Sequence, residues 1–125
     1  MTYERQRLGI VGENLAAREL ASRGYAILER RYRTEYGEID IVARDGDTLV
    51  FVEVRARASA EFGTAAESIT DAKKRRVARM AVDYIARHHV ADTECRFDVV
   101  AVDEAFSDEP QITVYRAAFD APAAL

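Results

Sequence analysis

The sequence predicts an α/β fold in which a mixed five-stranded sheet is flanked by helices on both faces. Residues 7–23 and 70–88 have the composition and apolar spacing of helices, and five shorter segments are rich in the apolar residues of strands. Their order is helix, three strands, helix, two strands, which is typical of helices packed on a mixed sheet. At 125 residues the chain is long enough to bury a core. We therefore expect residues 1–125 to form a single domain.

The first helix is expected over residues 7–23, which are rich in Ala, Leu, Glu and Arg, and Gly24 is a natural stop. One face of this helix carries residues at positions i, i+3, i+4 and i+7. These residues are Glu13, Ala16, Ala17 and Leu20. Because the alanines and the leucine should pack inward, a glutamate among them needs a partner.

Three strands are expected next, over residues 25–33, 38–44 and 48–57. The sequence Asp45-Gly46-Asp47 separates the second from the third, and Asp-Gly favours the positive φ values of a hairpin turn. A loop that contains Gly63 follows.

The second helix is expected from about Thr70 to His88, with Thr70 or Asp71 as its N-cap. Its apolar stripe repeats at helical spacing. The stripe consists of Val77, Met80, Ala81, Tyr84 and Ile85.

Two more strands are expected over residues 95–103 and 111–116, and the tail from about residue 118 is expected to be loose. Cys95 begins the first of these strands, and we expect it in the core. It is the one cysteine of the chain, so no intrachain disulfide can form, which fits a reducing compartment.

Charge and hydropathy indicate in which compartment the protein is expected. The net charge is −4, but eight acidic and only two basic residues fall in 92–125, which leaves a slight basic excess in the rest. The N-terminus does not resemble a signal peptide, and the apolar runs are too short to span a bilayer. We expect a cytoplasmic protein with no membrane partner.

The segment GEIDIVARDGDTLVFVEVRAR, residues 37–57, carries many charges for an apolar hairpin. Strand alternation predicts that Glu38 and Asp40 share one side, and that Ile39 and Ile41 share the other. On the next strand it places Glu53, Arg55 and Arg57 together. A bare carboxylate among apolar residues is costly to desolvate, so these groups should be paired or bind a cation.

Two interpretations of the hairpin charges remain open. They can form Glu–Arg pairs across a half-exposed sheet. Alternatively, Asp40 and Glu53 can meet across the two strands and bind one hard cation, since Mg²⁺ takes one or two carboxylates together with waters and phosphates.

The spacing of these residues resembles the PD-(D/E)xK nuclease pattern, with Asp40 as the first acid and Glu53-Val54-Arg55 at the E-x-K position. More specifically, the chain resembles the YraN family, whose members are similar to archaeal Holliday-junction resolvases with a restriction-endonuclease-like fold. The segments that carry the resemblance are GIVGENLAARELASRGY, GEIDIVARDGDTLVFVEVRAR, FGTAAESITDAKKRR and RFDVVAV, from Gly9 to about Val102.

The resemblance implies roles for several residues. Asp40 and Glu53 would be the main ligands of Mg²⁺ or Mn²⁺, Glu13 would complete the metal site, and Glu38 would orient the ligands. Asp40, Glu53, Glu13 and Arg55 would be the catalytic residues. The implied partner is branched or structured DNA, and junction cleavage implies a homodimer.

Arg55 departs from the pattern, because lysine can lose its proton when buried and arginine effectively cannot. Arg55 could stabilise developing charge but could not act as a general base. Two remedies are open: a metal-bound water needs less help, or Lys73, one helical turn before Val77, replaces the missing amine. The plainer interpretation of Lys73 is a side chain that reaches from the helix start to solvent.

The basic residues are candidates for contacts with phosphates, which supply affinity independent of sequence. The predicted nucleic-acid-binding residues are Arg33, Arg57, Lys73, Lys74 and Arg76. Tyr32 and Tyr36 can stack on bases, although packing within the sheet is the plainer interpretation.

Three functions are compatible with the sequence. The first is a Mg²⁺- or Mn²⁺-dependent endonuclease acting on structured DNA. The second is a decayed nuclease fold that binds nucleic acid without cutting it, with Arg55 as the mark of decay. The third is a structural domain whose charges form salt bridges, which predicts no salt-dependent DNA binding.

Overall fold

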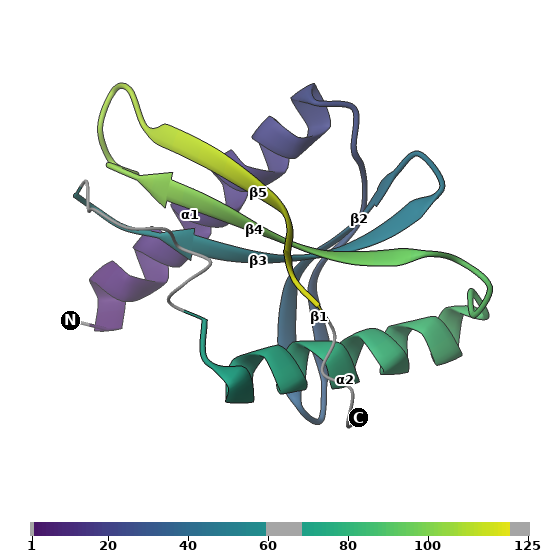
Figure 1. The fold of residues 1–125 in the computed structure, drawn as a ribbon. Helices are drawn as coiled ribbons and strands as arrows, with labels where there is room; N and C mark the ends of the chain where they lie inside the picture. Colours follow the sequence, from purple (N-terminus) through teal and green to yellow (C-terminus); the bar gives the residue numbers. More distant parts are fainter. Residues whose placement is uncertain (1, 60–68, 121–125) are drawn as a thin grey trace.

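The fold was analysed in a computed structural model, which describes residues 2–59 and 69–120. The elements follow the order α-β-β-β-α-β-β (Figure 1). They are α1 (Thr2–Ser22), β1 (Ala26–Thr34), β2 (Gly37–Asp45), β3 (Thr48–Ala56), α2 (Asp71–His88), β4 (Cys95–Asp103) and β5 (Gln111–Phe119). The predicted fold class is thus confirmed.

The element boundaries differ from the prediction mainly at the two ends of the chain. Helix α1 begins at Thr2, five residues before the predicted start, because residues 2–6 include good helix formers and an acid in the first turn, Glu4. Strand β5 continues to Phe119, which is buried. A loose tail beginning at residue 118 is therefore wrong for residues 118 and 119, while the Gly63 loop and residues 121–125 lie outside the described residues.

The sheet has the strand order β1-β2-β3-β4-β5, so every strand neighbours the next one in the chain. All pairs are antiparallel except β3 and β4, which run parallel. A parallel pair needs a crossover connection, and α2 lies in this one. The sheet is therefore mixed, as predicted.

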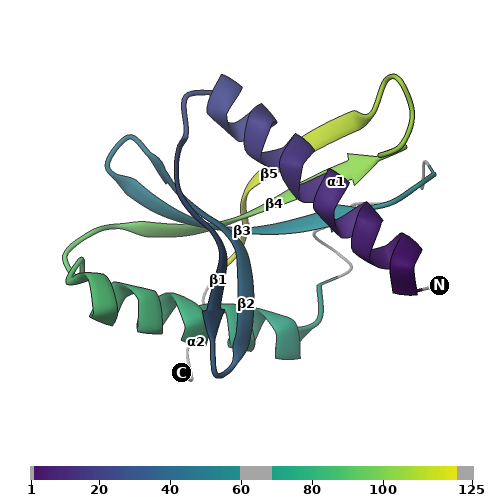
Figure 2. The same ribbon diagram turned by 180° about the vertical axis from the view of Figure 1, so that it is seen from behind.

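The two helices cover opposite faces of the sheet, as the two views in Figures 1 and 2 show. On one face Ala16 and Leu20 of α1 pack with Val50, Val52 and Val100. On the other face the stripe of α2 packs with buried residues from all five strands, β1 to β5. The buried residues of this second cluster include Val77, Met80, Ala81, Tyr84, Phe51, Phe97 and Val99. The predicted apolar faces of both helices are confirmed.

Local signals define the β2–β3 turn and the start of α2. Asp45 pairs with Thr48, and Gly46 has a φ of 61°, as the Asp-Gly signal predicted. Thr70 is the N-cap of α2, and its side chain accepts a hydrogen bond from the Lys73 backbone N–H at 3.1 Å. Cys95 is exposed, which corrects its predicted place in the core, because it is the first residue of its strand.

No helix within the described residues is long and apolar enough to cross a membrane.

Candidate functional site

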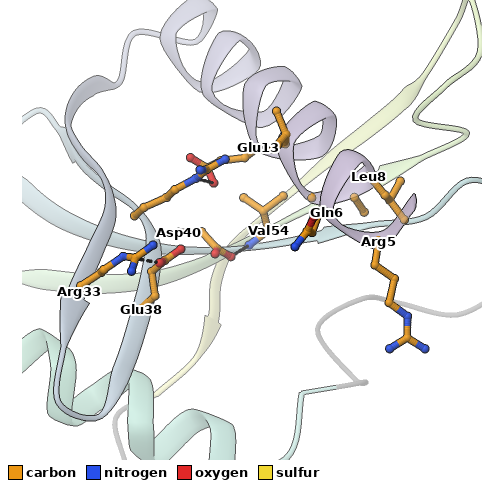
Figure 3. A pocket seen from close by; sticks show the side chains of 12 residues that line it. Arg5, Gln6, Leu8, Glu13, Arg33, Glu38, Asp40 and Val54 are labelled. Carbon is orange, nitrogen blue, oxygen red and sulfur yellow. Dashed lines mark hydrogen bonds and ion pairs between the residues drawn. The ribbon is translucent and has the colours of Figure 1, made fainter. Parts of the chain in front are cut away.

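The candidate site lies where β2 separates from β3. The backbone pairing of these strands runs from Asp45↔Thr48 to Ile41↔Val52 and goes no further toward Asp40. There, the backbone N–H of Val54 donates to Asp40 Oδ2 at 2.8 Å (Figure 3). The side chain of Asp40 thus takes a place that a backbone acceptor would have in a continuous ladder. Beyond it, the β1–β2 hairpin turns away from β3 and extends past α2 (Figure 2).

At Asp40 the side chains of β2 change the face of the sheet on which they pack. Ile39 packs in the cluster on the α2 side, whereas Ile41 packs in the cluster on the α1 side. On β1, Arg31 lies between Arg30 and Tyr32, which pair with Ile41 and Ile39, and Arg31 has a φ of 55°. The expectation that Ile39 and Ile41 share one side is therefore wrong. Simple alternation fails at the point where β1, opposite Asp40, contains the left-handed Arg31.

Asp40 and Glu53 form an electrostatic unit at the strand split. Glu53 is 7% exposed, and Asp40 is half-buried. Burial, followed by the negative charge of Glu53, raises the pKa of Asp40 to about 7, while the Val54 N–H opposes this rise. Burial also raises the pKa of Glu53. The sequence prediction that these two carboxylates meet across the hairpin agrees with this coupling.

Lys73 is a cation in direct contact with Glu53, one member of this pair. Its Nζ lies 3.4 Å from Glu53 Oε1, and its positive charge lowers the pKa of both Glu53 and Asp40. Arg55 is half-buried, and its charge also lowers the pKa of Glu53. Within the described residues, however, no hydrogen bond or ion pair joins Arg55 to either carboxylate.

Glu13 is engaged elsewhere. It is 6% exposed and lies on the inward face of α1, as predicted. Its Oε1 accepts from Arg30 Nε and its Oε2 from Arg31 Nε, both at 3.0 Å. The partner that this buried glutamate was expected to need is thus a pair of arginines.

The three predicted metal ligands do not converge. Across residues 2–59 and 69–120, no three His, Cys, Asp or Glu side chains form a group that could hold a metal ion. Glu53 faces α2 through Lys73, Glu13 belongs to α1, and Asp40 lies between the two faces. The close pair is Asp40 and Glu53.

A cavity of about 600 Å³ opens on the α1 side of the strand split (Figure 3). Glu13 and Asp40 both line it, so the cavity connects the helix glutamate with the split. The charged and polar residues of its wall are Arg5, Gln6, Glu13, Arg31, Arg33, Glu38 and Asp40. In Figure 3, Arg33 lies beside Glu38, and their Nε–Oε2 distance is 3.2 Å.

Arg5 and Gln6 are wall residues that sequence reasoning did not single out. Helical spacing could have found Arg5, because residues 5, 9 and 13 share one helix face and all three line the cavity. It was missed because the helix was expected to begin at residue 7.

The predicted nucleic-acid-binding residues fall in three places. Lys73, Lys74 and Arg76 lie in the first two turns of α2. Arg33 lies on the wall of the cavity, with its side chain 81% exposed. Arg57 follows β3, where its Nε lies 3.5 Å from Asp103 Oδ1.

The two tyrosines have different environments. Tyr32 is buried and donates to Asp83 Oδ2 at 2.7 Å, as its plainer interpretation predicted. Tyr36 is exposed, with the guanidinium of Arg79 5.6 Å from its ring centre.

The element order and the five-stranded mixed sheet flanked by two helices are consistent with a nuclease-like α/β fold. Comparison with protein families gives a more specific assignment. Residues 12–102 match the model of the uncharacterised protein family UPF0102, which is the YraN family, and the chain belongs to this family.

Relatives from several bacteria match over most of their length. A UPF0102 protein of Moorella thermoacetica is 52% identical over 82% of this chain and 85% of its own. One from Anaeromyxobacter dehalogenans is 50% identical over 93% and 86%, respectively. One from Geobacter sulfurreducens is 40% identical over 95% and 93%. The similarity therefore extends beyond the strand motif to nearly the whole chain.

Proposed function

We propose that this protein is a metal-dependent endonuclease that hydrolyses phosphodiesters in structured, junction-like DNA. The observation that carries this proposal is the Asp40–Glu53 pair at the strand split, where burial and mutual repulsion raise the pKa of Asp40 to about 7. The pKa values of both acids remain raised although Lys73 lowers them, so the pair can accept further positive charge. Asp40 also lines the cavity, and a carboxyl group with a perturbed pKa on a cavity wall is typical of a functional site.

The residues at the split fit a hard divalent cation. Mg²⁺ and Mn²⁺ prefer oxygen ligands, and Mg²⁺ needs only one or two carboxylates from the protein. Asp40 and Glu53 would hold it. Glu13 fits less well, because both of its oxygens already accept from arginines. When bound, the cation would lower the pKa of a water and polarise a phosphate oxygen.

The surrounding residues suggest how DNA would be held. Arg33, Arg57, Lys74 and Arg76 would contact phosphates independently of sequence. Glu38, which pairs with Arg33, would orient that arginine at the wall of the cavity. Because a junction carries two strands to be cut, a homodimer would place two such sites on one substrate.

Titration of Mn²⁺ into the protein by calorimetry, paired with cleavage of a four-way DNA junction, tests the proposal. We expect the wild type to bind Mn²⁺ and cut the junction, and the double variant Asp40→Asn/Glu53→Gln to do neither. The matched control is Asp108→Asn/Glu109→Gln, which removes two exposed acids from the β4–β5 loop. A wild type that neither binds Mn²⁺ nor cuts the DNA would exclude the endonuclease.

The alternative is a catalytically decayed module that binds nucleic acid without cutting it. The presence of Arg55 at the position of the motif lysine favours this alternative. It predicts that the protein shifts branched DNA in a gel in a salt-dependent way but leaves it intact with Mg²⁺ or Mn²⁺. Gain of cleavage by Arg55→Lys would support decay.

A further inference from the structure

Lys73 occupies an unusual position for a lysine at the start of a helix. Its side chain is 30% exposed, yet its ammonium contacts Glu53, whose side chain is 9% exposed. A surface lysine has many solvated rotamers to choose from, and here the side chain instead turns inward to the acid pair. The side chain is thus partly exposed while its ammonium contacts a buried carboxylate.

The N-cap of α2 determines the direction of this side chain. Thr70 Oγ1 accepts from the backbone N–H of Lys73, which places Lys73 in the first turn of the helix. Val77, four residues later, is buried against the sheet. Because residues four apart share a helix face, Lys73 also projects toward the sheet.

Arg55 does not contact the carboxylates of the acid pair within the part of the chain that the structure describes. It follows Glu53 by two residues on β3, but in the described ranges it forms no hydrogen bond or ion pair with Glu53 or Asp40. Lys73 Nζ, by contrast, lies 3.4 Å from Glu53 Oε1. The direct cationic contact that the strand motif would assign to its lysine therefore comes from the helix.

We propose that Lys73 is a catalytic residue of this site, where its ammonium contacts the phosphate of the DNA bond that is cut. The proposal rests on the endonuclease function proposed above. In the free protein the ammonium is held by Glu53, and on substrate binding its three N–H donors are shared between Glu53 and a phosphate oxygen.

The role of Lys73 follows from where charge develops during hydrolysis. A bond forms from a water oxygen to phosphorus, and a P–O bond to one sugar breaks. One water proton ends on the departing sugar oxygen, and the other passes to solvent as the new phosphate monoester ionises. Lys73 stays protonated throughout and stabilises the negative charge that builds on the phosphoryl oxygens.

Single-turnover and steady-state cleavage of a four-way junction with Mn²⁺ test this role. We expect Lys73→Met to lower kcat by about 100-fold or more, with KM changed less than about threefold, because it removes a donor to the transition state. Lys73→Arg should restore part of the rate. Arg87→Met, which removes a cation from the last turn of the same helix, should cut like the wild type.

Two further measurements separate catalysis from a structural role. Calorimetry should show that Lys73→Met still binds Mn²⁺ with the wild-type stoichiometry, and its Tm should stay close to the wild type. If Lys73→Met does not fold, Lys73→Gln, which keeps a polar end group without the positive charge, takes its place. Loss of Mn²⁺ binding, or a rise in KM at unchanged kcat, would overturn the catalytic role.

The two proposals fail in different ways. If the wild type and Lys73→Met cut the junction equally well, the role of Lys73 is overturned but the endonuclease function is not. A wild type that binds Mn²⁺ but cuts no DNA overturns the endonuclease function, and the role of Lys73 with it.

Discussion

Asp40 illustrates, at the scale of one residue, how position changes the chemistry of a carboxyl group. An exposed aspartate is ionised near neutral pH, but burial and the charge of Glu53 raise the pKa of this one from 3.8 to about 7. The Val54 N–H at 2.8 Å holds the carboxyl group in the split between strands. Even with Lys73 nearby, ionised Asp40 therefore destabilises the folded protein, unless a further cation binds at the pair.

The substitution Asp40→Asn should increase the stability of the protein at pH 8 by up to about 4 kcal/mol, because the pKa shift from 3.8 to about 7 spans about three units at roughly 1.4 kcal/mol each. Asparagine can still accept the Val54 hydrogen bond through its Oδ1 and carries no charge to repel Glu53. Folded wild type holds the proton up to about pH 7 and the unfolded chain only to about pH 4. Its stability therefore falls as pH rises between these values, and the advantage of the variant shrinks toward pH 4.

Urea unfolding of both proteins at pH 5 and pH 8 would measure this difference. Asp47→Asn, in the exposed β2–β3 turn, is the control, and its stability should match that of the wild type at each of the two pH values. An Asp40→Asn variant that is less stable than the wild type at pH 8 would contradict the raised pKa.

At the scale of elements, α1 packs closely on β3, and residues of both elements line the cavity. Gly12 faces the end of β3, and a Cβ at this position would collide with the Cβ of Ala56. The missing side chain thus lets the helix approach the strand that carries Glu53. Gly9, one turn earlier, has open space at the same point, because no atom lies within 4 Å of the place that a Cβ would take.

The substitutions Gly12→Ala and Gly9→Ala should therefore change stability in opposite directions. Gly12→Ala should cost about 1–3 kcal/mol, because the helix must move away from β3. Gly9→Ala should stabilise by about 0.5–1 kcal/mol, because alanine is the better helix former and meets no obstacle. Thermal and chemical unfolding would measure both, and equal effects of the two variants would show that α1 does not pack as described.

At the scale of the whole molecule, one buried carboxylate joins several strands. Asp98 on β4 is 0% exposed, accepts from Arg96 and the Tyr25 hydroxyl, and receives the Ala117 N–H of β5. Arg96 also donates to Asp45 Oδ2 at the end of β2, at 2.9 Å. Each partner removes part of the cost of burying the charge.

The substitution Asp98→Ala should destabilise the protein by about 3–5 kcal/mol, because the buried Tyr25 hydroxyl and the Ala117 N–H lose their acceptor and half-buried Arg96 retains only Asp45. Asp108→Ala, in the exposed β4–β5 loop, should change the free energy of unfolding by less than about 0.5 kcal/mol. Guanidinium unfolding compares the two. A loss below about 1 kcal/mol for Asp98→Ala would show that this network contributes little to the fold.

Local sequence signals were sufficient to predict the order of elements, the β2–β3 turn, the N-cap Thr70 and the apolar stripe of α2. These features depend on neighbours within a few residues, where periodicity and backbone preference are decisive. Glu13 on a packing face and the Asp40–Glu53 pair were predictable for the same reason, since helical and strand spacing place them.

The way in which these residues are joined depends on the tertiary structure instead. Ile39 and Ile41 lie on different faces next to the left-handed Arg31 of β1, and no glycine in the sequence signals that conformation. The pairing of Glu13 with Arg30 and Arg31, and that of Glu53 with Lys73, joins residues 17 to 20 positions apart on different elements. Such contacts depend on how helices dock on the sheet, which long-range packing sets and local sequence patterns do not.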